Sequence, residues 1–276
     1  MNRYRKMVVF FVDLLGTKAN KDFDDKLLIH RLFHKEIEES AERTPPHVAY
    51  GRTVFSFSDC AYILYYYKDD QEHSEEDDMA LLEVAMRNTS FSLALILNSG
   101  HLVRGGIAVG DAYFDEFGCF GPAVEKAYLL ESTRANMPIV ILEDELGRNF
   151  VEWAERADTR KEQYFKALLE GIFDKELPQL VERGERGEYF LNAFYHLEMT
   201  STAKGDGNES YTLNTVRDNI KSAIAAWRTA LPSSPVNEVK KTPVRSTPQD
   251  KWNWMESYLE TKELKTSLSS FSISLK

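Results

Sequence analysis

Cysteine and long apolar runs are both scarce in this sequence of 276 residues. Only two cysteines occur, Cys60 and Cys119, and each lies within an apolar segment. This argues against a disulfide framework or a zinc cluster and is typical of a reduced, cytoplasmic protein. The apolar run near the N-terminus is too short to span a membrane, and it carries Asp13 in place of a signal-peptide cleavage site. We therefore expect a cytoplasmic protein with no membrane partner.

Positive charge is also in deficit. Lysine and arginine number 34 against 44 acidic residues, which gives a formal net charge of −10. An extended nucleic-acid groove needs clustered cations, so we expect no nucleic-acid partner. The six histidines offer no metal-binding pattern, because His30 and His34 are four positions apart on a predicted helix but lack a third ligand.

What the sequence does contain is ample apolar material, interrupted by two acids. Hydrophobic residues make up 43% of the chain, enough for a packed core. The segment 7–17, MVVFFVDLLGT, predicts a buried central strand that ends at Asp13. The segment 54–67 predicts two strands with Asp59 at the turn between them. If these strands are neighbours, two carboxylates meet at one end of a sheet, where Mg²⁺ or Mn²⁺ would neutralise them.

The order of the predicted elements indicates an α+β fold. We expect helices over 22–42, 79–99 and 121–134, a strand pair over 101–115 that turns near Gly110, and a strand over 137–142. This order implies a mixed or antiparallel sheet with helices on one face. These elements make up a predicted catalytic domain, residues 1–143.

The pattern changes after residue 143. Helical spacing without strand alternation predicts a helical extension, residues 144–231, with helices over 145–153, 161–183, 189–197 and 211–231. The remainder, residues 232–276, begins with a proline-rich linker over 232–248. A short helix over 249–265 follows, and then a serine-rich tail that is either mobile or an edge strand.

Three segments, taken together and in order, resemble class III nucleotidyl cyclases. They are FVDLLGT at 11–17, FSFSDCAYIL at 55–64, and VRGGIAVGDAYFDEFGCFGPAVEKAYLLES at 103–132. The first two resemble the metal-binding segments of that family, and the third resembles its RxGIxxG and GxxVNxAxRxE motifs. The resemblance implies a ferredoxin-like palm fold, two Mn²⁺ or Mg²⁺ ions per active site, a nucleoside triphosphate substrate, and a homodimer with active sites at the interface.

The departures from the family pattern are also informative. Phe55 and Gly118 occupy the positions that read a purine base in familiar cyclases, and neither side chain can hydrogen-bond a base edge. Glu125 and Leu129 occupy the positions of the transition-state asparagine and arginine. The segment 114–132 is similar to the pyrimidine cyclases of the Pycsar antiphage systems, which make cyclic UMP or cyclic CMP. That similarity implies a signal that acts on its effector through the cyclic nucleotide.

The predicted metal site consists of Asp13, Asp59 and the backbone carbonyl of Leu14, with both carboxylates bridging two ions. The alternative is that Asp13 caps the turn after its strand and that Asp59 serves only the hairpin.

For the substrate, we expect backbone N–H groups of Leu15, Gly16 and Thr17 to bind the triphosphate. Arg104 would contact phosphate or the dimer partner, or form a structural ion pair. Tyr50 and Phe55 would stack on the base, although core packing is the usual fate of strand aromatics.

Two other functions fit the sequence. A cyclase-derived module could bind a nucleotide without turning it over, which the residues at 125 and 129 favour. A palm-type nucleotidyltransferase could instead make oligonucleotide signals.

Overall fold

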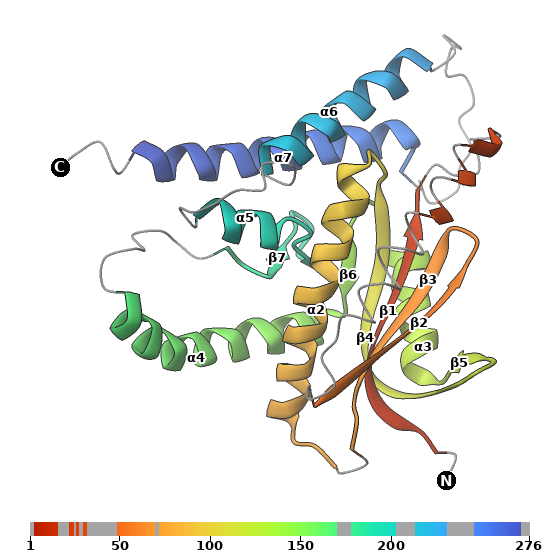
Figure 1. The fold of residues 1–276 in the computed structure, drawn as a ribbon, viewed down its shortest axis with the longest axis vertical. Helices are drawn as coiled ribbons and strands as arrows, with labels where there is room; N and C mark the ends of the chain where they lie inside the picture. The colour runs from red at the N-terminus through yellow and green to blue at the C-terminus, as the bar shows by residue number, and fades with distance from the viewer. Residues whose placement is uncertain are drawn as a thin grey trace.

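A mixed β-sheet is the centre of the computed structural model (Figure 1). The structure describes residues 3–15, 22–24, 26–27, 30–31, 49–69, 72–169, 178–202, 213–230 and 246–271. The strands are β1 (Arg5–Leu14), β2 (Tyr50–Phe57), β3 (Cys60–Tyr67), β4 (Val103–Asp115), β5 (Gly118–Phe120), β6 (Val140–Leu142), β7 (Val181–Arg183) and β8 (Tyr189–Leu191). Their order is β2-β3-β1-β4-β6-β8-β7, and β5 pairs with β4 alone. The β4–β6 pair is parallel and the other pairs are antiparallel.

The central strand β1 is buried on both faces. Its even-numbered residues, such as Phe10, pack into one apolar cluster, and odd-numbered residues such as Phe11 pack into another. β1 pairs with β3 on one side and with β4 on the other, which satisfies its backbone hydrogen bonds along its length. The predicted buried strand ending in Asp13 is therefore confirmed.

Helices cover both faces of the sheet, rather than one face as expected. Helix α2 (Glu75–Asn98) starts with a capping box between Ser74 and Asp77 and packs on the face that carries Phe10. Helix α3 (Pro122–Leu129) packs through Ala123 and Ala127 on the opposite face. It continues into a π-helical turn, η1 (Leu130–Arg134). The α+β class and the mixed sheet are confirmed.

Helix α2 is, among the described residues, long and apolar enough to cross a membrane by length and composition alone. In this structure 61% of that apolar window is buried inside the protein.

Strand β4 is one continuous strand, so the prediction of a turn near Gly110 is wrong. The ladder with β1 runs from Leu14 opposite Val103 to Arg5 opposite Ala112, and it passes straight through Gly110. The turn comes instead after Asp115, where β5 folds back on β4. Pairing with the long strand β1 keeps β4 extended through a sequence that, by itself, predicts a turn.

The region after residue 143 contributes strands as well as helices. β7 and β8 form a hairpin that joins the sheet through β6, so the helices expected over 161–183 and 189–197 are wrong at these strands. Helices α4 (Asp144–Leu169), α5 (Tyr195–Thr202) and α6 (Leu213–Ala230) complete this region. The division at residue 144 stays a prediction, although the sheet itself continues across it.

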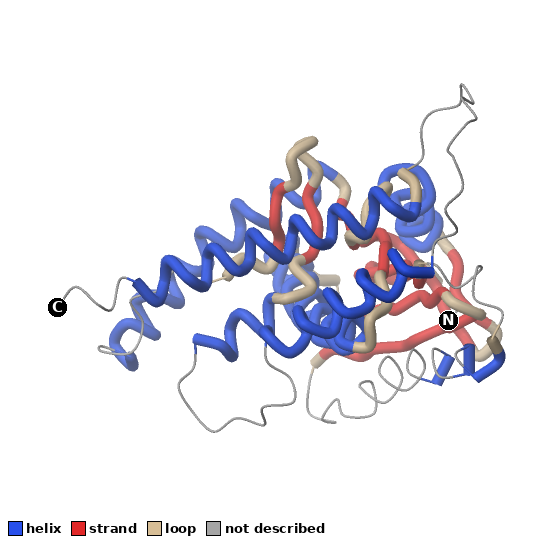
Figure 2. The backbone as a smooth tube through the Cα atoms, turned by 90° about the horizontal axis from the view of Figure 1, so that it is seen from above, coloured by secondary structure: helices blue, strands red, loops and turns tan. Residues whose placement is uncertain are grey.

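The last helix, α7 (Pro248–Phe271), lies beside α6 in both views (Figures 1 and 2). It extends to Phe271, into the first part of the serine-rich segment expected to be mobile or an edge strand, and residues 272–276 lie outside the described part of the chain. The predicted helix over 22–42 lies largely outside the described residues, as does nearly all of the linker predicted over 232–248.

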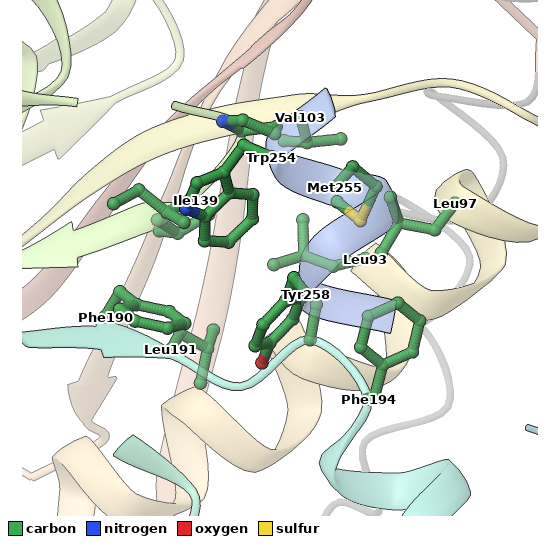
Figure 3. A pocket seen from close by; sticks show the side chains of 13 residues that line it. Leu93, Leu97, Val103, Ile139, Phe190, Leu191, Phe194, Trp254, Met255 and Tyr258 are labelled. Atoms are coloured by element: carbon green, nitrogen blue, oxygen red, sulfur yellow. The ribbon is translucent and has the colours of Figure 1, made fainter. Parts of the chain in front are cut away.

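Helix α7 is attached to the sheet by an apolar contact and a polar one. Trp254, Met255 and Tyr258 point toward residues of β8 and α2 around a cavity of about 20 Å³, room for about one water molecule (Figure 3). One turn further on, the ammonium of Lys262 is buried between the carboxylates of Glu182 and Glu198. This packing makes α7 part of the fold rather than an appended tail.

Candidate functional site

The backbone brings the two predicted metal ligands to the same end of the sheet. Asp13 is paired in register with Cys60, the residue that follows Asp59. The N–H of Leu14 donates to the carbonyl of Asp59 across 2.9 Å. Ser58 takes a left-handed conformation, with φ of 56°, in the tight β2–β3 turn. Residues that are 46 positions apart in the sequence thus become neighbours at this edge.

The two acids share a thiol as a common neighbour. Burial raises the pKa of Cys60, and the nearby negative charges of Asp13, Asp59 and Glu131 raise it further. The side chain of Asp13 is 23% exposed, so it is accessible from solvent although its strand is buried. The site is therefore a partly open, acidic end of the sheet.

An arginine and a third acid complete this cluster. Arg104 on β4 lies directly opposite Asp13, and its Nη2 is 3.4 Å from the Oδ2 of Asp13. Its Nε forms an ion pair with Oε1 of Glu131, whose side chain is only 4% exposed. Arg104 therefore bridges two carboxylates, one open to solvent and one buried.

The donor set fits a hard divalent cation. Mg²⁺ is commonly held by one or two carboxylates together with substrate phosphates, and Mn²⁺ suits the same oxygen ligands. Asp13 and Asp59 supply such carboxylates, and Leu14, whose backbone carbonyl is the third predicted ligand, directly follows Asp13. Within the described part of the chain, no three His, Cys, Asp or Glu side chains form a metal-binding group. Binding would therefore depend on the two aspartates, backbone oxygen and phosphate.

The predicted triphosphate loop is only partly available. The N–H of Leu15 donates to the carbonyl of Leu102 across 2.8 Å, so it is not free to bind phosphate as expected. The β1–β4 ladder continues one residue past the end of β1 and uses this donor. The side chain of Leu15 packs against the apolar cluster of α6 and α7. Gly16 and Thr17 lie outside the described residues.

The expected aromatic pair does not form, because Tyr50 and Phe55 lie on opposite faces of the sheet. Tyr50 packs near Tyr65, and its hydroxyl accepts from Nδ2 of Asn88 on α2. Phe55 is on the same face as Asp13 and lies near the ring of Phe114 on β4. Residues five apart in a strand point to opposite faces. The described structure thus brings Phe55, and not Tyr50, toward the site's side of the sheet.

The three remaining positions singled out in the sequence are on exposed or open parts of this face. Glu125 and Leu129 are exposed on α3, and the side chain of Leu129 is 53% exposed. Gly118 lies at the start of β5, where an added Cβ would meet nothing within 4 Å.

Sequence reasoning missed Glu131, although a signal for it exists. Ala123, Ala127 and Glu131 follow one another at intervals of four, which places them along one side of a helix. The two alanines form the buried stripe of α3, so an acid at the next position predicts a buried carboxylate with a cationic partner. Arg104 is that partner.

No protein-family model matches the sequence, and no curated protein matches it either. Solved structures of similar shape do exist. The catalytic core of a rhodopsin-guanylyl cyclase with converted specificity, in complex with ATPαS, is 15% identical with a TM-score of 0.40, over 68% of this chain and 96% of that one. The monomeric guanylyl cyclase domain of the RhoGC fusion protein from the aquatic fungus Blastocladiella emersonii is 12% identical with a TM-score of 0.43, over 69% and 98%.

A bacterial light-regulated adenylyl cyclase is 11% identical with a TM-score of 0.33, over 81% of this chain and 58% of that one. Since every one of these TM-scores is below 0.5, we infer no activity from these neighbours.

Proposed function

We propose that this protein is a metal-dependent nucleotidyl cyclase that converts UTP or CTP to the 3′,5′-cyclic monophosphate and pyrophosphate. The observation that carries the proposal is the meeting of Asp13 and Asp59 at one open end of the sheet, beside Arg104. Two acids and an arginine there suit a substrate that brings both metal ions and phosphate. The three segments that resemble class III cyclases contain all three residues.

The reaction would need mainly positioning and charge neutralisation. The ribose 3′-oxygen attacks the α-phosphorus, the bond to the pyrophosphate oxygen breaks, and the proton of the 3′-hydroxyl is released. Two Mg²⁺ or Mn²⁺ ions, when bound, supply Lewis acidity and lower the pKa of that hydroxyl. Asp13, Asp59 and the carbonyl of Leu14 would hold these ions. Arg104 would bind the negatively charged phosphates once Asp13 is engaged as a ligand.

A pyrimidine substrate is favoured by what the site's face lacks. Phe55 offers an apolar surface beside Phe114, and Gly118 offers no side chain, so neither position can read the edge of a purine. The similarity to antiphage pyrimidine cyclases supports the same choice. We infer a role in antiphage signalling, in the cytoplasm, with an effector that responds to the cyclic nucleotide.

A homodimer is favoured by large apolar residues that are exposed near this end of the sheet. Phe57 is 80% exposed at the end of β2, two residues before Asp59, and Leu129 is 53% exposed on α3, two residues before Glu131. Exposed apolar side chains of this size are typical of interaction surfaces. A second copy that covers them would bring its own Glu125 and Leu129 toward the partner's substrate.

The proposal is tested by incubating the purified protein with each of ATP, GTP, UTP and CTP plus Mn²⁺ and identifying the products by mass. We expect cyclic UMP or cyclic CMP together with pyrophosphate. Tight nucleotide binding without any product would instead favour a binding module, which the missing asparagine and arginine at positions 125 and 129 support. Linear or cyclic oligonucleotides would identify a palm-type nucleotidyltransferase. Absence of both binding and turnover would contradict all three.

A further inference from the structure

Glu131 is a charged residue that is buried in the protein interior, where unpaired charges are unfavourable. The residue is 3% exposed and lies in the π-helical turn η1, on the face of the sheet that carries Asp13. A buried carboxylate is costly unless a cation and hydrogen bonds compensate it. Its cation is Arg104, whose Nε lies against Oε1 of Glu131.

The chain around Glu131 is built for this contact. The backbone at the end of α3 and in η1 packs closely on β4 at Gly106, where an added Cβ would lie 2.2 Å from the carbonyl oxygen of Ala127 and 3.1 Å from the nitrogen of Glu131. Only glycine permits so close an approach. Isolated π-helical turns are rare and are frequent at functional sites. A glycine and an irregular turn thus combine to bring one buried acid into contact with Arg104.

The two contacts of Arg104 differ in length and in burial. Its Nη2 is 3.4 Å from Asp13, longer than the 2.7–2.9 Å of a good charge-assisted hydrogen bond. Its Nε is in close contact with the buried Glu131. Arg104 therefore forms an ion pair with one buried carboxylate and a longer contact with one carboxylate that is more exposed to solvent. If Asp13 becomes a metal ligand, the contact that Arg104 loses is the longer one.

We propose that Glu131 is a positioning residue that keeps the guanidinium of Arg104 directed at the triphosphate when Asp13 holds metal. This inference rests on the proposed function, since it requires a metal-bound triphosphate at this end of the sheet. Nη2 then donates to a phosphate oxygen instead of to Asp13, while Nε remains on Glu131. Glu131 itself touches neither substrate nor metal and acts only through Arg104.

A double-mutant cycle tests this separation of roles. The variants are Glu131→Gln, which keeps the shape and removes the charge, Arg104→Gln, and the two combined. The probes are Mn²⁺ alone, followed by electron paramagnetic resonance, and 3′-deoxy-UTP or 3′-deoxy-CTP with Mn²⁺, followed by calorimetry. These nucleotides lack the attacking hydroxyl and cannot cyclise.

We expect each single variant to weaken binding of the 3′-deoxynucleotide by about tenfold or more, as for loss of a hydrogen bond to a charged group. The affinity for Mn²⁺ alone should not fall. The double variant should bind no more weakly than Arg104→Gln, because Glu131 has no effect once its arginine is absent. The exposed Glu152→Gln on α4 serves as the matched control and should bind as the wild type does.

Two results would overturn the inference: wild-type affinity in Glu131→Gln, or losses that add in the double variant. Failure of the wild type to bind the 3′-deoxynucleotide with Mn²⁺ would instead contradict the proposed function. If Glu131→Gln does not fold, judged by thermal unfolding, Glu131→Asp replaces it in the cycle. Glu131→Asp keeps the charge but shortens the side chain by one methylene. If it weakens binding of the 3′-deoxynucleotide in the wild-type background but not in the Arg104→Gln background, the inference is again supported. If it weakens binding in both backgrounds, the inference is refuted.

Discussion

Gly106→Ala should destabilise the protein and displace Glu131. The added Cβ would lie 2.2 Å from the backbone oxygen of Ala127, and real Cβ atoms essentially never approach within 3.0 Å. Helix α3 must therefore move by at least 0.8 Å, the difference between these two distances. The obstacle is backbone rather than the end of a flexible side chain, so no rotamer change relieves it.

The size of the effect follows from two opposing contributions. Overpacking of this kind costs about 1–3 kcal/mol, and replacing glycine with alanine returns about 0.4–1 kcal/mol by restricting the unfolded chain. We expect a net loss of about 1–2 kcal/mol in the free energy of unfolding, which corresponds to a fall of about 2–8 °C in the thermal midpoint. Binding of 3′-deoxy-UTP or 3′-deoxy-CTP with Mn²⁺ should weaken as well, because Arg104 loses its anchor.

Gly184→Ala in the β7–β8 turn is the matched control. The three atoms nearest to its added Cβ belong to the carboxylate end of Glu188, which can rotate away, so we expect a change within about 0.5 kcal/mol and unchanged binding. The two variants are compared by thermal unfolding and by calorimetry under the same conditions. Equal midpoints for Gly106→Ala and Gly184→Ala would refute the close packing of α3 on β4.

Three further predictions concern other parts of the molecule. Lys262→Met leaves the carboxylates of Glu182 and Glu198, each 13% exposed, without their buried cation and should cost about 3 kcal/mol in denaturant unfolding. The exposed Lys221→Met should change little, and equal stabilities of the two variants would contradict the role of the Lys262 cluster in docking α7. Burial lowers the pKa of His196 in the folded protein, so below about pH 6.5 the unfolded chain binds more protons than the folded one. The thermal midpoint should therefore fall as the pH is lowered from 6.5, and it should fall less steeply in His196→Gln. An identical pH dependence in both proteins would count against this. Burial raises the pKa of Cys119 to about 11. In a Cys60→Ser background, alkylation of Cys119 at about pH 8 should therefore be about a hundred times slower than alkylation of a free thiol. A rate equal to that of a free thiol would show that Cys119 is not buried.

The local pattern of apolar and polar residues was sufficient to predict the strands at the centre of the fold. The apolar run of β1 predicted a strand buried on both faces, and the split run around Asp59 predicted the hairpin that the structure contains. Because β1 and β3 pair directly, two strand ends identified separately come together. The backbones of Asp13 and Asp59 therefore lie at the same end of the sheet, and their role as metal ligands stays a prediction.

The errors arise where a partner, rather than local sequence, decides the outcome. Gly110 and Asp111 resemble a turn, but the long ladder with β1 keeps them in a strand. β7 and β8 are three residues each, too short to show alternation, and they join the sheet by pairing with each other and, through β8, with β6. The N–H of Leu15 is occupied because the ladder extends one residue further than the sequence indicates.

The alternation of side chains along a strand and the packing of α3 and η1 account for the rest of the site. Tyr50 and Phe55 are five apart, so a continuous strand separates them, which could have been read from the sequence. Glu131 could be predicted as buried from its spacing, but its contact with Arg104 depends on how closely η1 approaches Gly106. That distance is a property of the packed structure alone.

The central claim is that Asp13 and Asp59 together hold the metal ions for cyclisation. The most direct measurement is Mn²⁺-dependent conversion of UTP and CTP, followed by mass identification, in the wild type, Asp13→Asn, Asp59→Asn and Lys221→Met. We predict cyclic pyrimidine nucleotide from the wild type and Lys221→Met, and none from either folded aspartate variant. Undiminished product from Asp13→Asn or Asp59→Asn would contradict the account.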